Sequence, residues 1–328
     1  MRVAVIGAGS WGTALSIELA RSGHVVLLWG RDPEVAARIE ADGRNPRRLT
    51  EHVIPPSVRS SSDLAEALGF GEIVLVAVPC ASFRPLLSLA PPSEGEGLRL
   101  VSTAKGIEPE SLKRMTEILL ERYPKASVAA LSGPTFAEGV ANGDPTAAVV
   151  ASKDRSFVER LQDSLSSPTF RLYRSEDVAG VELCGALKNV VAIAAGIVSG
   201  LGFGHNTLAA LVTRGLAEIG RIVRARGGQE RTVHGLAGIG DLLLTCTGKQ
   251  SRNRFVGEQI GRGKRLADVL LEMPEVAEGA RTCLAVPHMA AKAGVDAPIA
   301  EAVVSVLYEG VAPRDAVDQL MTRALRSE

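Results

Sequence analysis

A single lysine in a long apolar stretch is the residue best suited to move a proton. Lys188 belongs to VELCGALKNVVAIAAG (residues 181–196) and is the only charged residue between Glu182 and Arg214. Burial favours the neutral form of a lysine and lowers its pKa, so that it can exchange a proton with a substrate near neutral pH. The alternative is that Lys188 extends its ammonium group to solvent from an otherwise buried helix. The neighbouring Asn189 could hold a group of a substrate or cofactor.

A second candidate block, GLAGIGDLLLTCTGKQSRNRFVG, covers residues 235–257. Asp241 follows two closely spaced glycines, so the backbone before it can bend tightly. Further along, Ser251, Arg252 and Asn253 precede a helical pattern. Their donors, together with the free N–H groups of a helix start, suit a phosphate group. A capped and solvated helix start explains the same three residues equally well.

The N-terminal glycines have the spacing of a dinucleotide-binding turn. In VIGAGSWGTAL (residues 5–15), Gly7, Gly9 and Gly12 form G-x-G-x-x-G between an apolar run and a helical pattern. Gly7 permits the tight turn, Gly9 lets a pyrophosphate approach the backbone, and Gly12 lets the helix pack closely on the strand. Trp11 lies among them. We expect its backbone N–H near the pyrophosphate and its indole covering the cofactor; a plain tight turn is the weaker alternative.

Two residues after the second apolar run bear on the choice between NAD and NADP. Asp32 is placed to bind the ribose hydroxyls of NAD. With Pro33 behind it, however, it also suits the N-cap of the next helix. Arg31 suits the additional 2′-phosphate of NADP. The sequence therefore predicts that NADP is accepted alongside NAD.

Two further segments follow predicted strands, at the edge where open α/β sheets bind ligands. They are STAKGIE (residues 102–108) and LSGPTFAEG (residues 131–139). We expect Lys105 to face this crevice, and Gly133 and Thr135 to line it. Either segment taken alone could be an ordinary loop.

The elements that must position these residues are of two kinds. The first half alternates apolar runs with helical patterns, which predicts strands buried on both faces of a doubly wound parallel sheet. The predicted strands are 2–6, 25–29, 73–78, 98–102, 128–131, 146–150 and 170–173, and the helices among them include 13–21, 108–122 and 155–165. After about residue 175 only helices are predicted, over 178–198, 207–226, 252–261, 266–272, 279–293, 299–309 and 313–326. We expect an α/β protein with an N-terminal Rossmann-like dinucleotide-binding domain (1–176) and an all-helical substrate-binding and catalytic domain (177–328).

Composition narrows the classes of function. The chain of 328 residues suits about two domains. Lys plus Arg and Asp plus Glu are equal at 37 each, which argues against a nucleic-acid or membrane-surface protein. The cysteines are scattered and the histidines lack metal-ligand spacing, so we expect reduced thiols, a cytoplasmic location and no metal. Residues 189–213 carry no Asp, Glu, Lys or Arg, but their glycines predict a buried helix with a glycine-rich loop rather than a membrane span.

Taken together, these blocks resemble the bacterial-type NAD(P)-dependent glycerol-3-phosphate dehydrogenases. The resemblance rests on GAGSWGTA at 7–14, STAKGIE at 102–108, LSGPTFAEG at 131–139, CGALKNVVAIAAG at 184–196, GLAGIGDLLLTCT at 235–247 and SRNRFVG at 251–257, which follow the family's order. It implies interconversion of dihydroxyacetone phosphate and sn-glycerol 3-phosphate with NAD or NADP. Such an enzyme would supply glycerol 3-phosphate for phospholipid synthesis.

The resemblance also implies residue roles at the matching positions. Lys188 becomes the proton donor or acceptor, with Lys105 and Asp241 beside it in the active site. Together with the residues singled out above, the expected substrate contacts are Lys105, Gly133, Thr135, Lys188, Asp241, Ser251, Arg252 and Asn253. The expected cofactor contacts are Gly7, Gly9, Ser10, Trp11, Gly12, Arg31, Lys105, Ala137, Arg252, Val276 and Glu278.

Two other functions fit parts of the sequence. A β-hydroxyacid or 6-phosphogluconate-type dehydrogenase would share the layout and an active-site lysine, but the Ser-Arg-Asn block and GIGDLLLTCT argue against it. A non-catalytic dinucleotide sensor leaves the isolated Lys188 without a purpose. The expected partner is a small-molecule substrate, with no nucleic acid and no stable membrane insertion, and the Ala-rich helices could bury a homodimer surface.

Overall fold

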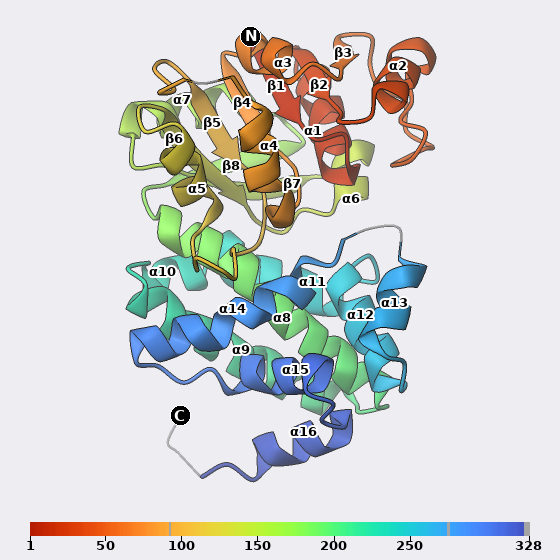
Figure 1. Cartoon of the computed structure of the whole chain (residues 1–328), viewed down its shortest axis with the longest axis vertical. Helices are drawn as coiled ribbons and strands as arrows, with labels where there is room; N and C mark the ends of the chain where they lie inside the picture. Colours follow the sequence, from red (N-terminus) through yellow and green to blue (C-terminus); the bar gives the residue numbers. More distant parts are fainter. Residues whose placement is uncertain (92, 274–275, 325–328) are drawn as a thin grey trace. The chain divides into compact units, whose positions relative to one another are not determined.

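The computed structural model describes residues 1–91, 93–273 and 276–324. The chain forms two compact units. The first contains Met1–Ala104 and Lys113–Glu182, and the second contains Lys105–Leu112 and the chain from Leu183 onward. The first unit is α/β and the second is helical, so the predicted fold class is confirmed (Figure 1).

An eight-stranded sheet forms the centre of the first unit. Its strands are β1 (Arg2–Ile6), β2 (Val25–Trp29), β3 (Val58–Ser61), β4 (Ile73–Val76), β5 (Arg99–Ser102), β6 (Ser127–Ser132), β7 (Thr146–Ala151) and β8 (Phe170–Ser175). They lie in the order β3-β2-β1-β4-β5-β6-β7-β8, and each neighbouring pair is parallel except β6 and β7. The chain leaves β1 first towards β2 and then returns to β4 on its other side. The carboxyl end of β1 is therefore the switch point where such folds bind ligands.

Helices cover both faces of this sheet (Figure 1). They are α1 (Ser10–Arg21), α2 (Pro33–Asp42), α3 (Leu64–Phe70), α4 (Phe83–Leu89), α5 (Met115–Arg122), α6 (Ala137–Asn142) and α7 (Arg155–Leu165). Alternate residues of a strand point to opposite faces. Val3 and Val5 of β1 accordingly share a core with α1, α2, α6 and α7, whereas Ala4 and Ile6 share one with α3, α4 and α5. This two-sided burial explains why the strands are continuous apolar runs.

Helices also make up the second unit, in which the described residues form no strand. They are α8 (Val178–Gly200, whose first turn lies in the first unit), α9 (His205–Ala225), α10 (Glu230–Val233), α11 (Asp241–Thr247), α12 (Arg252–Gly261), α13 (Leu266–Glu272), α14 (Glu278–Ala293), α15 (Pro298–Tyr308) and α16 (Pro313–Met321). By length and composition α8 could cross a membrane, but 94% of its most apolar window is buried inside the protein. The prediction of a buried helix here is confirmed.

Two glycines bring α8 and α12 into backbone contact. A Cβ added at Gly196 would lie 2.0 Å from the carbonyl oxygen of Arg254, and one added at Gly257 would lie 1.9 Å from that of Ile193. No side chain fits at either position without moving a helix. The glycines within the apolar run therefore set the distance between the two helices.

The structure differs from the predicted elements in four respects. β3 was not predicted, because this short edge strand is mostly polar. The short helices α3, α4, α6, α10 and α11 were also not predicted. The helix predicted over 108–122 is wrong in its first half: residues 105–112 belong to the second unit, Leu112 takes a φ of +58°, and α5 begins at Met115. The last helix, predicted over 313–326, ends at Met321, and residues 325 and 326 lie outside the described part of the chain.

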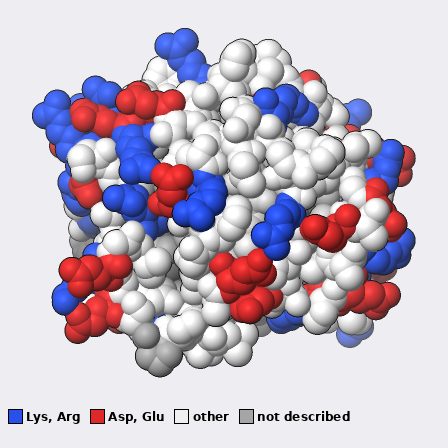
Figure 2. Space-filling view, turned by 90° about the horizontal axis from the view of Figure 1, so that it is seen from above, with Lys and Arg blue, Asp and Glu red and all other residues white. Residues whose placement is uncertain are grey.

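Charged residues of both signs share the surface. On the face drawn in Figure 2, Lys and Arg are interspersed with Asp and Glu, as their equal numbers would suggest. Many form exposed pairs within one helix, such as Arg38 with Asp42 and Arg155 with Glu159. Such pairs contribute little to stability, because both charges are already well solvated.

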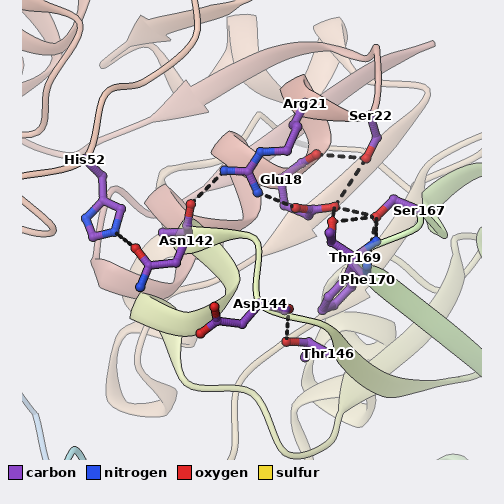
Figure 3. Close-up of polar contacts among 11 residues, drawn as sticks. Glu18, Arg21, Ser22, His52, Asn142, Asp144, Thr146, Ser167, Thr169 and Phe170 are labelled. Carbon is purple, nitrogen blue, oxygen red and sulfur yellow. Dashed lines mark hydrogen bonds and ion pairs between the residues drawn. The ribbon is translucent and has the colours of Figure 1, made fainter.

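A buried carboxylate, by contrast, ties α1 to the segment before β8. Glu18 is 3% exposed and accepts hydrogen bonds from the hydroxyl groups of Ser167 (2.5 Å) and Thr169 (3.1 Å) (Figure 3). It also pairs with Arg21 at 3.0 Å, and Arg21 donates to the carbonyl oxygen of Ala141 at 2.7 Å. These bonds fix the position of α1, which begins directly after Gly9 of the glycine motif and contains Gly12 in its first turn.

We expect Glu18→Ala to lower the free energy of unfolding by about 2 kcal/mol, because two partly buried hydroxyl groups and Arg21 lose their acceptor. Urea unfolding followed by circular dichroism measures this. The matched control is Glu159→Ala, which breaks an exposed pair and should change the free energy by less than about 0.5 kcal/mol. Equal effects of the two substitutions would contradict the structural role of Glu18.

Candidate functional site

The glycine turn between β1 and α1 has the geometry that its spacing predicts. Gly7 takes a φ of +121°, and a Cβ there would lie 2.7 Å from the carbonyl oxygen of Ala77. At Gly12 an added Cβ would lie 1.9 Å from the oxygen of Gly7, so helix and turn pack backbone to backbone. At Gly9 an added Cβ meets nothing within 4 Å, so this side of the turn is open. These features fit a dinucleotide whose pyrophosphate lies over Gly9 at the N-terminus of α1.

The first turn of α1 carries Ser10 and Trp11. The indole of Trp11 is partly buried against the core, and its Nε1 is buried without a hydrogen-bond partner among the described residues. A buried indole N–H normally has a partner. Trp11 follows Gly9, the glycine on the open side of the turn, so a bound ligand could supply the partner that its indole N–H lacks.

The end of β2 supports the second of the two interpretations of Asp32. Its Oδ1 accepts a hydrogen bond from the backbone N–H of Glu34 at 3.0 Å, and Pro33 is the first residue of α2. Asp32 is therefore an N-cap. The side chain of Arg31, one residue earlier, is exposed.

The segment after β6 is shaped by close packing of the backbone. Gly133 takes a φ of +149°, and a Cβ there would lie 2.9 Å from the Cα of Ala148. Thr135 donates its hydroxyl hydrogen bond to the carbonyl oxygen of Gly133 at 3.1 Å, and Ala137 begins α6. All three residues follow the carboxyl end of a strand parallel to β5, the edge at which ligands were expected.

The second unit contains a buried cluster of two lysines and one carboxylate. Lys188 is 5% exposed and donates to Asp241 Oδ1 at 2.5 Å and to the hydroxyl oxygen of Thr245 at 2.7 Å. Asp241 is 1% exposed, and its Oδ2 accepts from Lys105 Nζ at 2.8 Å. The predicted trio of Lys105, Lys188 and Asp241 is therefore in direct contact, and the alternative that Lys188 reaches solvent is wrong.

The surroundings of Lys188 favour its neutral form. Burial lowers the pKa of the amine, the Asp241 carboxylate raises it, and the charge of Lys105 lowers it again. The resulting pKa is about 7, compared with 10.5 for an exposed lysine. An amine with this pKa is present in both protonation states near neutral pH and can act as general acid or base.

A local irregularity in the backbone brings Asp241 into place. Leu236–Gly240 form a single π-helical turn directly before α11, and Asp241 is the first residue of that helix. A Cβ at Gly238 would lie 2.0 Å from the carbonyl oxygen of Val233. In place of the tight bend that the glycines would allow, the chain forms a π turn, which often occurs at functional sites.

Thr245 belongs to the cluster but was not predicted. Its hydroxyl donates to the carbonyl oxygen of Asp241 at 2.6 Å and thereby turns its own oxygen towards Lys188. A signal was present in the sequence, because Asp241 and Thr245 are four residues apart and share a helix face.

Two asparagine side chains link the elements around the cluster. The amide nitrogen of Asn189 donates to the carbonyl oxygen of Lys105 at 2.9 Å, and its oxygen accepts from the amide nitrogen of Asn253 at 3.0 Å. The oxygen of Asn253 accepts in turn from the backbone N–H of Gly279 at 2.9 Å. Asn189 thus holds protein groups, although the sequence left open a role towards substrate or cofactor.

The start of α12 confirms the capped helix start that the sequence allowed. Ser251 is the N-cap, and its oxygen accepts from the backbone N–H of Arg254 at 3.2 Å. Arg252 is exposed, whereas Ser251 and Asn253 are 4% and 8% exposed. The cap is therefore real, and Arg252 is the residue of the three whose side chain extends to the surface.

The remaining predicted cofactor contacts lie just before and at the start of α14. Val276 is 52% exposed, and Glu278 is the first residue of the helix. All four cysteines are buried, and none of them forms a disulfide. Within the described ranges, no three His, Cys, Asp or Glu side chains are grouped so as to hold a metal ion.

The α/β unit with its glycine turn, followed by a helical unit with a buried lysine, defines the class of two-domain nicotinamide-dependent dehydrogenases. Comparison with known proteins narrows this class. The sequence models for the N-terminus and the C-terminus of NAD-dependent glycerol-3-phosphate dehydrogenase match residues 2–158 and 177–318. The chain belongs to this family.

Individual relatives agree with this assignment. Proteins named glycerol-3-phosphate dehydrogenase [NAD(P)+] from Koribacter versatilis and Syntrophotalea carbinolica are 48% and 46% identical, over 100% of this chain and 98% and 99% of their own length. The crystal structure of glycerol-3-phosphate dehydrogenase from Coxiella burnetii aligns with a TM-score of 0.92 at 36% identity, covering 98% of this chain and 99% of that one. These findings do not favour a β-hydroxyacid or 6-phosphogluconate-type dehydrogenase.

The glycine geometry predicts that neighbouring substitutions separate stability from binding. Gly12→Ala should lower the free energy of unfolding by about 3 kcal/mol, because its Cβ collides with backbone. Gly9→Ala should change it by less than about 0.5 kcal/mol, because the space is open and the φ of −78° suits alanine. The same Gly9→Ala variant should bind NADH at least about tenfold more weakly, because its Cβ occupies the side that the pyrophosphate approaches.

Urea unfolding and NADH fluorescence titration measure these two quantities. An unfolding midpoint for Gly12→Ala equal to that of the wild type, or normal NADH affinity in Gly9→Ala, would contradict this description of the turn.

Proposed function

We propose that this protein interconverts dihydroxyacetone phosphate and sn-glycerol 3-phosphate with NAD(H) or NADP(H). The observation that carries the proposal is the buried contact of Lys188 with Asp241, which holds an amine with a pKa of about 7. The relatives are named glycerol-3-phosphate dehydrogenase [NAD(P)+], and oxidation of the secondary alcohol of glycerol 3-phosphate gives dihydroxyacetone phosphate.

The cofactor would be held by residues that the sequence had singled out. We assign the pyrophosphate to the turn formed by Gly7, Gly9, Ser10, Trp11 and Gly12. Arg31 is assigned to the 2′-phosphate that NADP carries on its adenosine ribose. Further contacts are assigned to Lys105, Ala137, Arg252, Val276 and Glu278. When bound, the reduced nicotinamide supplies the hydride that converts the carbonyl carbon into an alcohol carbon.

Side chains of this protein would neutralise and stabilise the negative charge that develops on the carbonyl oxygen. As the carbon is reduced, negative charge grows on the oxygen, and Lys188 Nζ donates a proton to it. Lys105 adds positive potential, which stabilises the same charge. Asp241 accepts from both ammonium groups, so it orients them and balances one of the two charges. In the reverse direction the neutral Lys188 removes the hydroxyl proton.

The phosphate of the substrate would be bound at the start of α12. Arg252 offers a forked pair of donors, and Ser251 and Asn253 flank it. We also assign Gly133 and Thr135 to substrate binding. Anchoring the phosphate fixes the carbonyl group for reaction, so that binding energy is used for alignment.

The wider role follows from the reaction. We propose that the protein acts in the cytoplasm, supplies glycerol 3-phosphate for phospholipid synthesis and forms a homodimer without stable membrane insertion. In support, the apolar helix α8 is almost entirely covered by the protein.

An initial-rate assay with dihydroxyacetone phosphate and either NADH or NADPH tests the activity. We expect oxidation of both cofactors, and we expect Lys188→Ala to lose most of kcat while it still binds NADH, because only the proton donor is removed. A wild type without turnover, or a Lys188→Ala variant with near-normal turnover, would refute the proposal.

The pKa of Lys188 predicts opposite pH profiles for the two directions. Reduction needs the protonated amine, so its kcat/KM should fall as the pH rises through about 7; oxidation needs the neutral amine, so its kcat/KM should rise over the same range. The substrate phosphate also titrates, with a pKa of about 6. Asp241→Asn distinguishes the Lys188 amine from the substrate phosphate. Loss of the carboxylate lowers the Lys188 pKa further, so the part of the pH profile due to Lys188 moves to lower pH while the part due to the phosphate stays in place.

The anchor at α12 predicts a change in substrate affinity. Arg252→Ala should raise the KM for dihydroxyacetone phosphate by about tenfold or more, because a charge-assisted pair of hydrogen bonds is lost. Arg262→Ala is the matched control, since Arg262 lies just beyond the other end of α12 and pairs with Glu258 on the surface. An unchanged KM in Arg252→Ala would remove this residue from the anchor.

A further inference from the structure

The segment between α2 and β3 is built onto the glycine turn, and nothing assigned so far uses it. We call residues 43–54 the arginine loop, because its sequence GRNPRRLTEHVI contains Arg44, Arg47 and Arg48. The loop is closed at its base, where the backbone N–H of Ile54 donates to the carbonyl oxygen of Gly43 at 2.8 Å. The two ends of the loop are therefore held together.

A fully buried asparagine fastens the loop to the cofactor turn. Asn45 is 0% exposed. Its amide nitrogen donates to the carbonyl oxygen of Ala8 at 3.0 Å and to the hydroxyl of Thr13 at 2.9 Å. Ala8 lies between the first two glycines of the motif, and Thr13 follows the third. The loop is thus anchored on the turn that would hold the pyrophosphate.

The same asparagine sets the path of the two arginines that follow it. Its side-chain oxygen accepts from the backbone N–H groups of Arg47 and Arg48, at 3.0 and 3.1 Å. Further along, His52 Nε2 lies 2.9 Å from the side-chain oxygen of Asn142, the last residue of α6 (Figure 3). Leu49 takes a φ of +49°, which a leucine adopts only where its surroundings impose it. The loop is held at several points.

Arg47 pairs with the carboxylate of Asp32, which would otherwise be available to accept hydrogen bonds from the ribose hydroxyls. Its Nη2 lies 2.7 Å from Asp32 Oδ2, while Asp32 Oδ1 caps α2. Both oxygens of Asp32 therefore have protein partners. An acidic residue at the end of β2 selects NAD by accepting from the ribose hydroxyls, and it repels a 2′-phosphate. Here that selection is blocked by an arginine from another segment.

The local charge also favours a phosphate. Arg31 and Arg47 carry two positive charges and Asp32 one negative charge, so the three together are positive. The Arg47–Asp32 pair is largely exposed, with 60% and 38% of the two side chains accessible. Such a pair contributes little to stability, so a 2′-phosphate can share or replace Asp32 as the partner of Arg47 at small cost.

We propose that Arg47 is a cofactor-specificity residue, which neutralises Asp32 and binds the 2′-phosphate of NADP. This inference rests on the proposed function only in taking a nicotinamide dinucleotide as the ligand. It differs from the assignment of Arg31, because it makes the arginine loop, positioned by Asn45, part of the cofactor site.

Isothermal titration calorimetry of the full chain, which measures its affinities for NADP+ and for NAD+, tests the proposal. Arg47→Gln should weaken NADP+ binding by about tenfold or more, because a charge-assisted hydrogen bond is lost. It should leave NAD+ binding unchanged or strengthen it, because Asp32 Oδ2 is released from its partner. Arg38→Gln is the matched control: it removes one exposed arginine paired with Asp42 on the neighbouring helix, and it should change neither affinity. Equal changes for both cofactors in Arg47→Gln, or no change for NADP+, would overturn the proposal.

A second variant tests the blocked carboxylate. Asp32→Asn keeps an oxygen for the helix cap and removes the charge, so NAD+ binding should change by less than about threefold. A loss of about tenfold or more in NAD+ affinity would show that Asp32 accepts hydrogen bonds from the ribose hydroxyls. It would contradict the claim that Arg47 blocks this carboxylate. These titrations need no turnover. Failure of dihydroxyacetone phosphate reduction is therefore distinguishable from failure of this inference.

Discussion

The second unit depends on one carboxylate shared by two lysines. Asp241 is almost fully buried and accepts from Lys105 and Lys188 through different oxygens. One negative charge cannot neutralise two positive ones in a medium of low polarity, so one amine is driven towards its neutral form. Lys188 is the more deeply buried of the two and takes this role. Replacing such a cluster with apolar residues would often be neutral or stabilising, which makes it an unusual choice for a purely structural core.

Much of the helical packing serves to hold this cluster. The π-helical turn places Asp241 at the start of α11, and Thr245 supplies a further acceptor for Lys188 one turn later. Backbone contact between α8 and α12, permitted by glycine, brings Asn253 within reach of Asn189. The two amides then fix the backbone at Lys105 and at Gly279. The geometry of three charges is thus set by parts of five separate segments.

The sequence predicted the fold class and the main chemical groups because both leave local patterns. Continuous apolar runs indicated buried strands, and the isolation of Lys188 in an apolar helix marked it without any spatial information. Motif order then linked Lys105, Lys188 and Asp241. Contacts between distant segments could not be predicted in this way. The pairing of Arg47 with Asp32 and the link between Asn189 and Asn253 depend on packing, and the assignment of residues 105–112 to the second unit reverses what helical periodicity suggested.

The central claim is that the fold holds the Lys188 amine near its point of half-protonation. The most direct measurement is an NMR pH titration of the protein with isotope-labelled lysine, in which the Lys188 signal is identified by its absence from Lys188→Arg. The structure predicts a midpoint of about 7 for this signal. A midpoint near the 10.5 of an exposed lysine would contradict the account.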